Sequence, residues 1–185
     1  MVSFNPISAP AWLFNKQAAP PSVGLAMIEL RILAAADVAL IQNWPSYPPE
    51  FEDLDYALRA GGWLDEYRNK PSTWIYIAEQ EREMLGFSIL SKTGEGEAEF
   101  RIALRADRTG KGLGATTTRM TLEKGFAGNA LSRIHLIVRR NNPRAIRLYK
   151  RIGFVENGEC MKNVNGKPVN FLSMDISRDS YLANM

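Results

Sequence analysis

The residues best suited to chemistry form a glycine-rich stretch, RADRTGKGLGA, at positions 105–115. Gly110, Gly112 and Gly114 allow backbone N–H groups to approach an anion that a Cβ would hold away. The stretch leads into a segment of helical character, and a helix N-terminus favours negative charge, so a phosphate is the ligand that it suits. Its spacing excludes a Walker A loop and differs from the G-x-G-x-x-G of dinucleotide-binding folds. Taken alone, a glycine-rich turn without a ligand is the alternative.

The elements that must position this loop follow from the hydrophobic pattern. Alternating or β-rich runs predict strands at 27–32, 73–79, 84–91, 98–104, 133–139, 154–161 and 169–176. Helices are expected at 34–44, at 52–60, from the loop to about Gly125, and at 142–152. Asn142 can cap the last of these helices, with Pro143 in its first turn and Gly153 at its end. This order predicts a single mixed α/β domain.

Composition limits the class of protein. The chain has 185 residues, of which 45% are hydrophobic and 23% charged, as in a soluble globular domain. No apolar run is long enough to span a membrane, and no secretory signal is recognisable, so we expect a cytoplasmic protein. One cysteine, Cys160, and one histidine, His135, argue against a disulfide and against the usual zinc sites. Residues 1–26 lack any period and are predicted to be an N-terminal extension, with the domain at 27–185.

The net charge of +3 hides two opposite clusters. Positions 139–151 hold six bases and no acid, which suits a phosphorylated ligand. Positions 46–66 hold six acids and one base. We expect this acidic stretch, with Trp63 or Tyr56 as an apolar wall, to attract a cation, although a solvated acidic loop is an equal alternative. The six acids are Glu50, Glu52, Asp53, Asp55, Asp65 and Glu66.

Two runs in this order, AEFRIALRADRTGKGLG and RIHLIVRRNNPRAIRLYKRIGF, resemble the two acetyl-CoA motifs of the GNAT superfamily of N-acetyltransferases. The resemblance covers roughly residues 73–176. It is nearest to spermidine N-acetyltransferases and ribosomal-protein N-terminal acetyltransferases, in EFRI, GKGLG and NNPRAIRLYKRIGF. It implies an α+β single domain with a mixed, mostly antiparallel sheet that is splayed at the acetyl-CoA site and flanked by helices. Thr109 is a departure, because the family usually has Gln or Arg there.

The resemblance also implies roles for individual residues. The backbone of Ile102, Ala103 and Leu104 would pair with pantetheine, and the Leu104 amide would stabilise the oxyanion. Tyr149 would protonate the departing thiolate, and Glu99, with Glu97 as second choice, would take a proton from the amine. The residues that would cradle the pyrophosphate are Thr109, Gly110, Lys111, Gly112, Leu113, Gly114 and Ala115, and those along the far side of the cofactor are Asn142, Ala145 and Tyr149. His135 alternates with apolar neighbours and is expected to be structural.

These observations predict an acetyl-CoA-dependent N-acetyltransferase that acts by direct attack of an amine and needs no metal. A small cationic amine such as a polyamine is the first expected acceptor, and a protein N-terminal amine is the second. A non-catalytic acyl-CoA-binding regulatory domain is the competing interpretation. We expect no nucleic-acid or membrane partner, because the basic cluster coincides with the cofactor motif and lacks interleaved aromatic residues. A homodimer or larger homo-oligomer is possible.

Overall fold

The computed structural model describes residues 27–110, 112–164 and 166–184. The expected N-terminal extension and Lys111 lie outside these described residues, so the domain boundary at residue 27 stays a prediction. Within the described part of the chain, no helix is long and apolar enough to cross a membrane.

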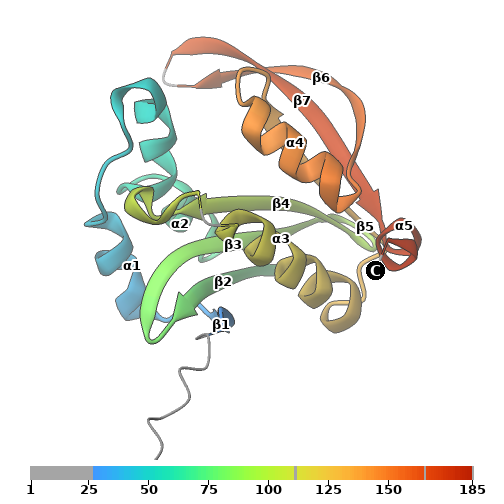
Figure 1. The fold of residues 1–185 in the computed structure, drawn as a ribbon, viewed down its shortest axis with the longest axis horizontal. Helices are drawn as coiled ribbons and strands as arrows, with labels where there is room; N and C mark the ends of the chain where they lie inside the picture. The colour runs from blue at the N-terminus through green and yellow to red at the C-terminus, as the bar shows by residue number, and fades with distance from the viewer. Residues whose placement is uncertain (1–26, 111, 165, 185) are drawn as a thin grey trace, which may run out of the picture.

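One seven-stranded sheet with the order β1-β2-β3-β4-β5-β7-β6 forms the centre of the molecule (Figure 1). Its strands are β1 (Glu29–Ile32), β2 (Thr73–Gln80), β3 (Glu83–Gly94), β4 (Glu97–Leu104), β5 (Arg133–Arg139), β6 (Val155–Val164) and β7 (Lys167–Ser177). Neighbouring strands are antiparallel except β4 and β5, which are parallel. The expected mixed, mostly antiparallel sheet of an α+β domain is therefore confirmed.

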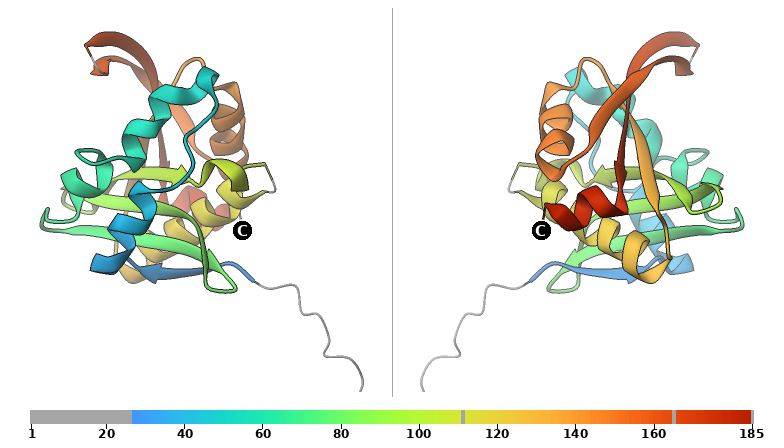
Figure 2. Two further views of the ribbon diagram at one scale, coloured as in Figure 1. Left: turned by 90° about the vertical axis from the view of Figure 1, so that its left-hand side faces the viewer. Right: turned by 90° about the vertical axis from the view of Figure 1, so that its right-hand side faces the viewer.

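Helices cover both faces of this sheet. The α-helices are α1 (Ala35–Gln42), α2 (Trp63–Tyr67), α3 (Leu113–Glu123), α4 (Pro143–Ile152) and α5 (Arg178–Ala183), and the 3₁₀ helices are η2 (Pro49–Leu58) and η3 (Ala106–Arg108). Figure 2 shows α3 and α4 on one face and α1, η2 and α2 on the other. As predicted, the Asn142 side chain caps α4, accepting from the Ala145 N–H at 3.1 Å, and Gly153 ends it with φ +114°.

The structure differs from the sequence prediction in the type or extent of two helical segments and contains two short helices that were not predicted. The expected helix at 52–60 is the 3₁₀ helix η2, and the short helix α2 that follows Gly61-Gly62 was missed. The helix after the loop continues beyond α3 as one π-helical turn, η4 (Lys124–Gly128). α5 was not predicted either.

Two apolar cores lie on opposite faces of the sheet. Phe100, Ile134 and Leu136 point toward α3 and α4, whereas Ile77, Phe87 and Ile89 pack under α1, η2 and α2. The packing at the first core is close, because a Cβ on Gly125 would lie 2.7 Å from Cδ1 of Ile134. Because side chains alternate across a strand, the core residues of β4 and β5 lie on one face of the sheet and the polar residues between them lie on the other.

Strands β4 and β5 pair over only three residues each, Glu97–Glu99 with Arg133–His135. Beyond that point β4 stays paired with β3 as far as Leu104, and β5 with β7 as far as Arg139. The two central strands therefore separate, which is the splay that the family resemblance implied.

Candidate active site

A cleft of about 740 Å³ lies where β4 and β5 separate. Its walls come from four places: the free edges of β4 and β5, the start of α4, the η2–α2 segment, and the β6–β7 hairpin. Among the predicted site residues, those that line it are Glu99, Ile102, Ala103, Asn142, Ala145 and Tyr149. The sequence also places the aromatic residues Tyr56 and Trp63 here, and the structure agrees.

The β4 edge offers its backbone to this cleft in a regular alternation. The Arg105 N–H donates to the Leu85 carbonyl of β3 at 2.8 Å, so backbone groups of odd-numbered residues in this part of β4 point toward β3. Those of Ile102 and Leu104 consequently point away from β3, into the separation. Ala103 was expected to share this role, but its backbone groups pair with Phe87. The side chain of Ala103 still lines the cleft.

The hydroxyl of Tyr47 donates a hydrogen bond to the Leu104 carbonyl at the end of this edge. Tyr47 lines the cleft and was not singled out by sequence analysis. Burial raises the pKa of Tyr47 to about 12, and Asp55 adds to the rise. Because the Arg105 N–H is bonded to β3, the peptide between Leu104 and Arg105 is held at both ends.

The glycine-rich loop ends at the N-terminus of α3. Gly110 and Gly112 have φ of +105° and +79°, values at which any Cβ would be strained. No side chain caps α3, and the first intrahelical bonds to the Gly112 carbonyl come from Ala115 and Thr116. The amides of Leu113 and Gly114 therefore lead the helix without an intrahelical acceptor, as an anion site requires. The Thr109 hydroxyl bonds the Ala106 carbonyl at 3.2 Å, within the loop itself.

The basic residues are more dispersed than the sequence predicted. Arg144 does lie by the loop, with Nη2 3.6 Å from where a Cβ on Gly110 would stand. Arg108, however, is ion-paired with Glu83, and Lys150 with Glu156 at 2.9 Å. In this structure both bases are thus engaged by acids of the protein, and phosphate binding by the basic cluster stays a prediction.

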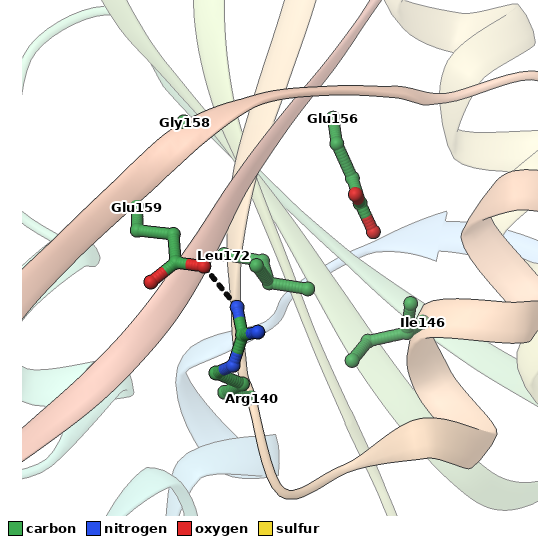
Figure 3. A pocket seen from close by; sticks show the side chains of 6 residues that line it. All are labelled: Arg140, Ile146, Glu156, Gly158, Glu159 and Leu172. Atoms are coloured by element: carbon green, nitrogen blue, oxygen red, sulfur yellow. Dashed lines mark hydrogen bonds and ion pairs between the residues drawn. The ribbon is translucent and has the colours of Figure 1, made fainter.

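Arg140 is a third base turned away from the loop. It pairs with Glu159 at a smaller hollow of about 490 Å³ between α4 and the β6–β7 hairpin (Figure 3). Ile146 and Leu172 form the apolar part of this hollow. Neither β4 nor the glycine-rich loop contributes to it, so it is separate from the cleft.

Tyr149 reaches the cleft from α4 through an aromatic setting. Its ring packs edge-on against Phe100 and Phe154, with ring centroids 6.4 and 5.6 Å apart. Burial raises its pKa well above the ordinary value of a phenol. No hydrogen-bond partner for its hydroxyl is found among the described residues. A phenol that stays protonated and unengaged is in the state that a proton donor needs.

Carboxylates and aromatic rings meet on the α2 side of the cleft. Glu99 accepts from Arg101 Nη2 at 2.9 Å and from the Tyr67 hydroxyl at 3.4 Å. The Arg101 guanidinium lies over the rings of Trp63 and Tyr67, 5.1 and 5.2 Å from their centroids. Glu97, the second predicted base, pairs with Arg133 at 3.3 Å and does not line the cleft.

Two of the six acids in the acidic stretch bind backbone amides of their own segment. Asp55 accepts from the Tyr47 N–H and Asp65 from the Gly61 N–H, which fixes the η2–α2 segment. Glu50 and Glu52 are exposed and are not among the residues that line the cleft, so attraction of a cation by these two acids stays a prediction. Glu66 does line it and accepts from the Tyr56 hydroxyl.

His135 also lines the cleft, although sequence analysis assigned it a structural role. The alternation of apolar and polar residues along β5 already indicates on which face of the sheet His135 lies. Since Ile134 and Leu136 are 0% and 1% exposed, His135 must face the opposite side of the sheet. Cys160 and Arg101 are further cleft residues whose position no local pattern indicated.

The sequence is similar to one protein-family model and to known proteins. Residues 38–154 match the acetyltransferase (GNAT) family model. Spermidine N(1)-acetyltransferase of Escherichia coli K12 is 30% identical over 123 residues, 64% of this chain and 66% of that protein. Its counterpart in Vibrio cholerae is 34% identical over 87 residues, 46% of this chain and 50% of that protein. The chain thus spans between half and just under two thirds of the length of these curated relatives.

Two solved structures share the fold over most of their length. A chimera of the Vibrio cholerae spermidine N-acetyltransferase SpeG and hSSAT superposes with a TM-score of 0.68 at 26% identity, covering 84% of this chain and 98% of that one. Vibrio cholerae spermidine N-acetyltransferase in complex with CoA and spermine gives 0.67 at 24% identity, with the same coverage.

Replacing Tyr47 by Phe tests the hydrogen bond at the end of the β4 edge. Because the pKa of Tyr47 is raised in the folded protein, folding favours the protonated phenol. This contribution to stability is fully present below about pH 10 and is lost as the pH rises toward about 12. Tyr47→Phe should therefore lower stability near pH 8 by about 0.5–1.5 kcal/mol, and should make the decline above pH ~10 shallower. Urea unfolding across this pH range measures both effects. Parallel wild-type and variant curves would contradict the prediction.

Proposed function

Because this chain belongs to the acetyltransferase (GNAT) family, we propose that it transfers the acetyl group of acetyl-CoA to a primary amine by direct attack. The observation that carries the proposal is the separation of β4 from β5 into a cleft that ends beside the uncapped N-terminus of α3. One end of the site thus suits a phosphate, and the middle offers an unpaired strand edge.

The residues present fit acetyl-CoA, which supplies a thioester carbonyl activated toward amines. The amides of Leu113 and Gly114, with Arg144 beside Gly110, would hold the pyrophosphate. The backbone of Ile102 and Leu104 would pair with pantetheine. The Leu104 amide would donate to the carbonyl oxygen, on which negative charge develops during attack.

Tyr149 would donate its proton to the sulfur of the leaving thiolate. Its raised pKa keeps the phenol protonated at neutral pH, and its position in the cleft wall supports contact with the reacting atoms. Asn142 and Ala145, which the family resemblance places along the cofactor, line the cleft with Tyr149, and this position supports their proposed role in binding the cofactor.

A small cationic amine, a polyamine first, is the proposed acceptor. Glu66 lines the cleft beside the aromatic ring of Tyr56, a combination that attracts an ammonium group, while Glu99 and the ring of Trp63 on the same wall are in contact with Arg101. The relatives named above, which are spermidine acetyltransferases, support the same choice. Arg101 favours the second candidate, a peptide N-terminal amine, because its guanidinium offers donors to a carbonyl or carboxylate near the amino group.

The proposal extends to location and assembly. A composition of 45% hydrophobic and 23% charged residues supports a cytoplasmic protein that uses the acetyl-CoA pool there. A homodimer or larger assembly is supported by Val155 and Met161, which are 66% and 65% exposed on the outermost strand β6.

The function is tested by measuring thiol release from acetyl-CoA with a panel of spermidine, spermine, amino acids, aminoglycosides and short peptides. We expect release with the polyamines at a turnover of roughly 1–10³ s⁻¹. Preference for peptides would select the second candidate. CoA binding in calorimetry without release from any amine would overturn catalysis and favour a regulatory acyl-CoA-binding domain.

Replacing Tyr149 by Phe should lower kcat by roughly 10- to 10⁴-fold, because the thiolate loses its proton donor, while CoA affinity is retained. Tyr181→Phe is the matched control: this tyrosine is also buried, but its hydroxyl donates to the Arg119 carbonyl outside the cleft. The measurement is steady-state thiol release alongside calorimetry. A Tyr149→Phe enzyme with wild-type turnover would remove the phenol from the mechanism.

Replacing Glu66 by Gln should raise KM for spermidine by about 3- to 10-fold with little change in kcat, since a partly exposed charge contact is lost. Glu50→Gln is the control, because Glu50 is an exposed acid of the same stretch outside the cleft. Equal KM values for both variants and the wild type would show that Glu66 does not meet the acceptor.

A further inference from the structure

His135 stands at the point where the two central strands diverge. It is the last residue of β5 that pairs with β4, and its partner in register is Glu99. Paired residues of neighbouring strands project from the same face of a sheet. Both side chains line the cleft on the face opposite the core that contains Ile134 and Leu136. This is the α2 side, from which the acceptor amine is proposed to enter.

We propose that His135 accepts the proton of the acceptor ammonium through intervening water and thereby generates the attacking amine. The inference rests on the proposed acetyl transfer. It assigns a role that sequence analysis gave to Glu99 or Glu97. An imidazole is suited to this task, because it is the side chain whose ordinary titration lies between pH 5 and 8.

The Thr93 hydroxyl contacts one imidazole nitrogen, and we assign the donor role in this pair to that nitrogen. Nε2 lies 3.0 Å from the Thr93 hydroxyl. When Nε2 donates to that oxygen, Nδ1 presents its lone pair, and no partner of Nδ1 is found among the described residues. Thr93 is the extra residue of a β-bulge in β3, between Lys92 and Gly94. Bulges re-aim side chains near active sites, so Thr93 acts as a positioning residue.

The carboxylates around His135 are already engaged. Glu99 accepts hydrogen bonds from both Arg101 and Tyr67. On the other side, Asp175 of β7 is in register with His135 and accepts from Arg133 at 2.7 Å. The charged residues at the paired strand positions around His135 are Glu97, Glu99, Arg133 and Asp175, and the other charged residues that line the same cleft are Glu66, Arg101, Arg139 and Lys162.

The ammonium gives one proton through water to Nδ1 of His135, and the freed lone pair forms the C–N bond while the C–S bond breaks. Tyr149 protonates the thiolate sulfur and is reprotonated by the second proton that the nitrogen sheds on becoming an amide. The imidazolium of His135 releases its proton to water. One proton per turnover is released in total.

The test is the pH dependence of kcat/KM for spermidine in wild type and His135→Asn. At pH ~7 the variant should be slower by roughly 10²- to 10⁴-fold. Its acidic limb should be replaced by a rise of about tenfold per pH unit, because only the free amine, whose pKa is about 10, then reacts. His135→Ala should be partly rescued by added imidazole, and Thr93→Val should show a smaller loss of the same kind.

Folding and cofactor binding are controlled separately. Urea unfolding and CoA calorimetry should be unchanged in His135→Asn, and Glu50→Gln, at an exposed acid that does not line the cleft, should keep wild-type turnover. A wild-type pH profile in His135→Asn, or a loss equal at every pH without imidazole rescue, would overturn the inference alone. Wild-type inactivity toward every amine would overturn the proposed function as well.

Discussion

The site depends on an incomplete strand pairing. Only three residues of β4 pair with β5, yet each strand is held along its other edge, β4 by β3 and β5 by β7. Backbone N–H and C=O groups in the separation have lost their sheet partners, and burying such groups unpaired costs free energy. Tyr47 satisfies one carbonyl, and the remaining groups form an edge ready to pair with an extended ligand. Because both backing strands are in place, this edge needs no rearrangement to bind.

The same separation divides the proposed chemistry between two faces of the sheet. Tyr149 comes from the α4 side, enclosed by Phe100 and Phe154, where burial keeps the phenol protonated. His135 and Glu99 come from the α2 side, where polar side chains line the cleft. The proposed donor for the leaving thiolate and the proposed acceptor for the amine proton thus come from opposite faces of the sheet. Tyr149 and His135 each reach the cleft from their own face of the sheet.

Some charged side chains of this molecule form contacts within the fold, and others face the cleft. The positions of Arg108, Arg140 and Lys150 in the chain suggest phosphate ligands. In the structure all three form ion pairs with glutamates of the protein. Arg144 lies on the side of α4 that reaches the loop. In the acidic stretch, Asp55 and Asp65 hold backbone amides of the η2–α2 segment, and Glu66 is left to face the cleft. A charge cluster in sequence therefore overstates the charge at the site.

The sequence by itself determined what depends on near neighbours along the chain: the order of strands, the glycine-rich loop, the Asn142 cap and the position of Tyr149 on α4. Alternation in β5 even determined which face His135 occupies. These features follow from periods of two or 3.6 residues and from local backbone conformation. Only the tertiary structure decided where β4 leaves β5, that Tyr47 bonds Leu104, that Glu66 rather than Glu50 meets the cleft, and that Thr93 bonds His135. Those contacts join residues far apart in sequence, and their geometry is set by packing between elements, which no local pattern encodes.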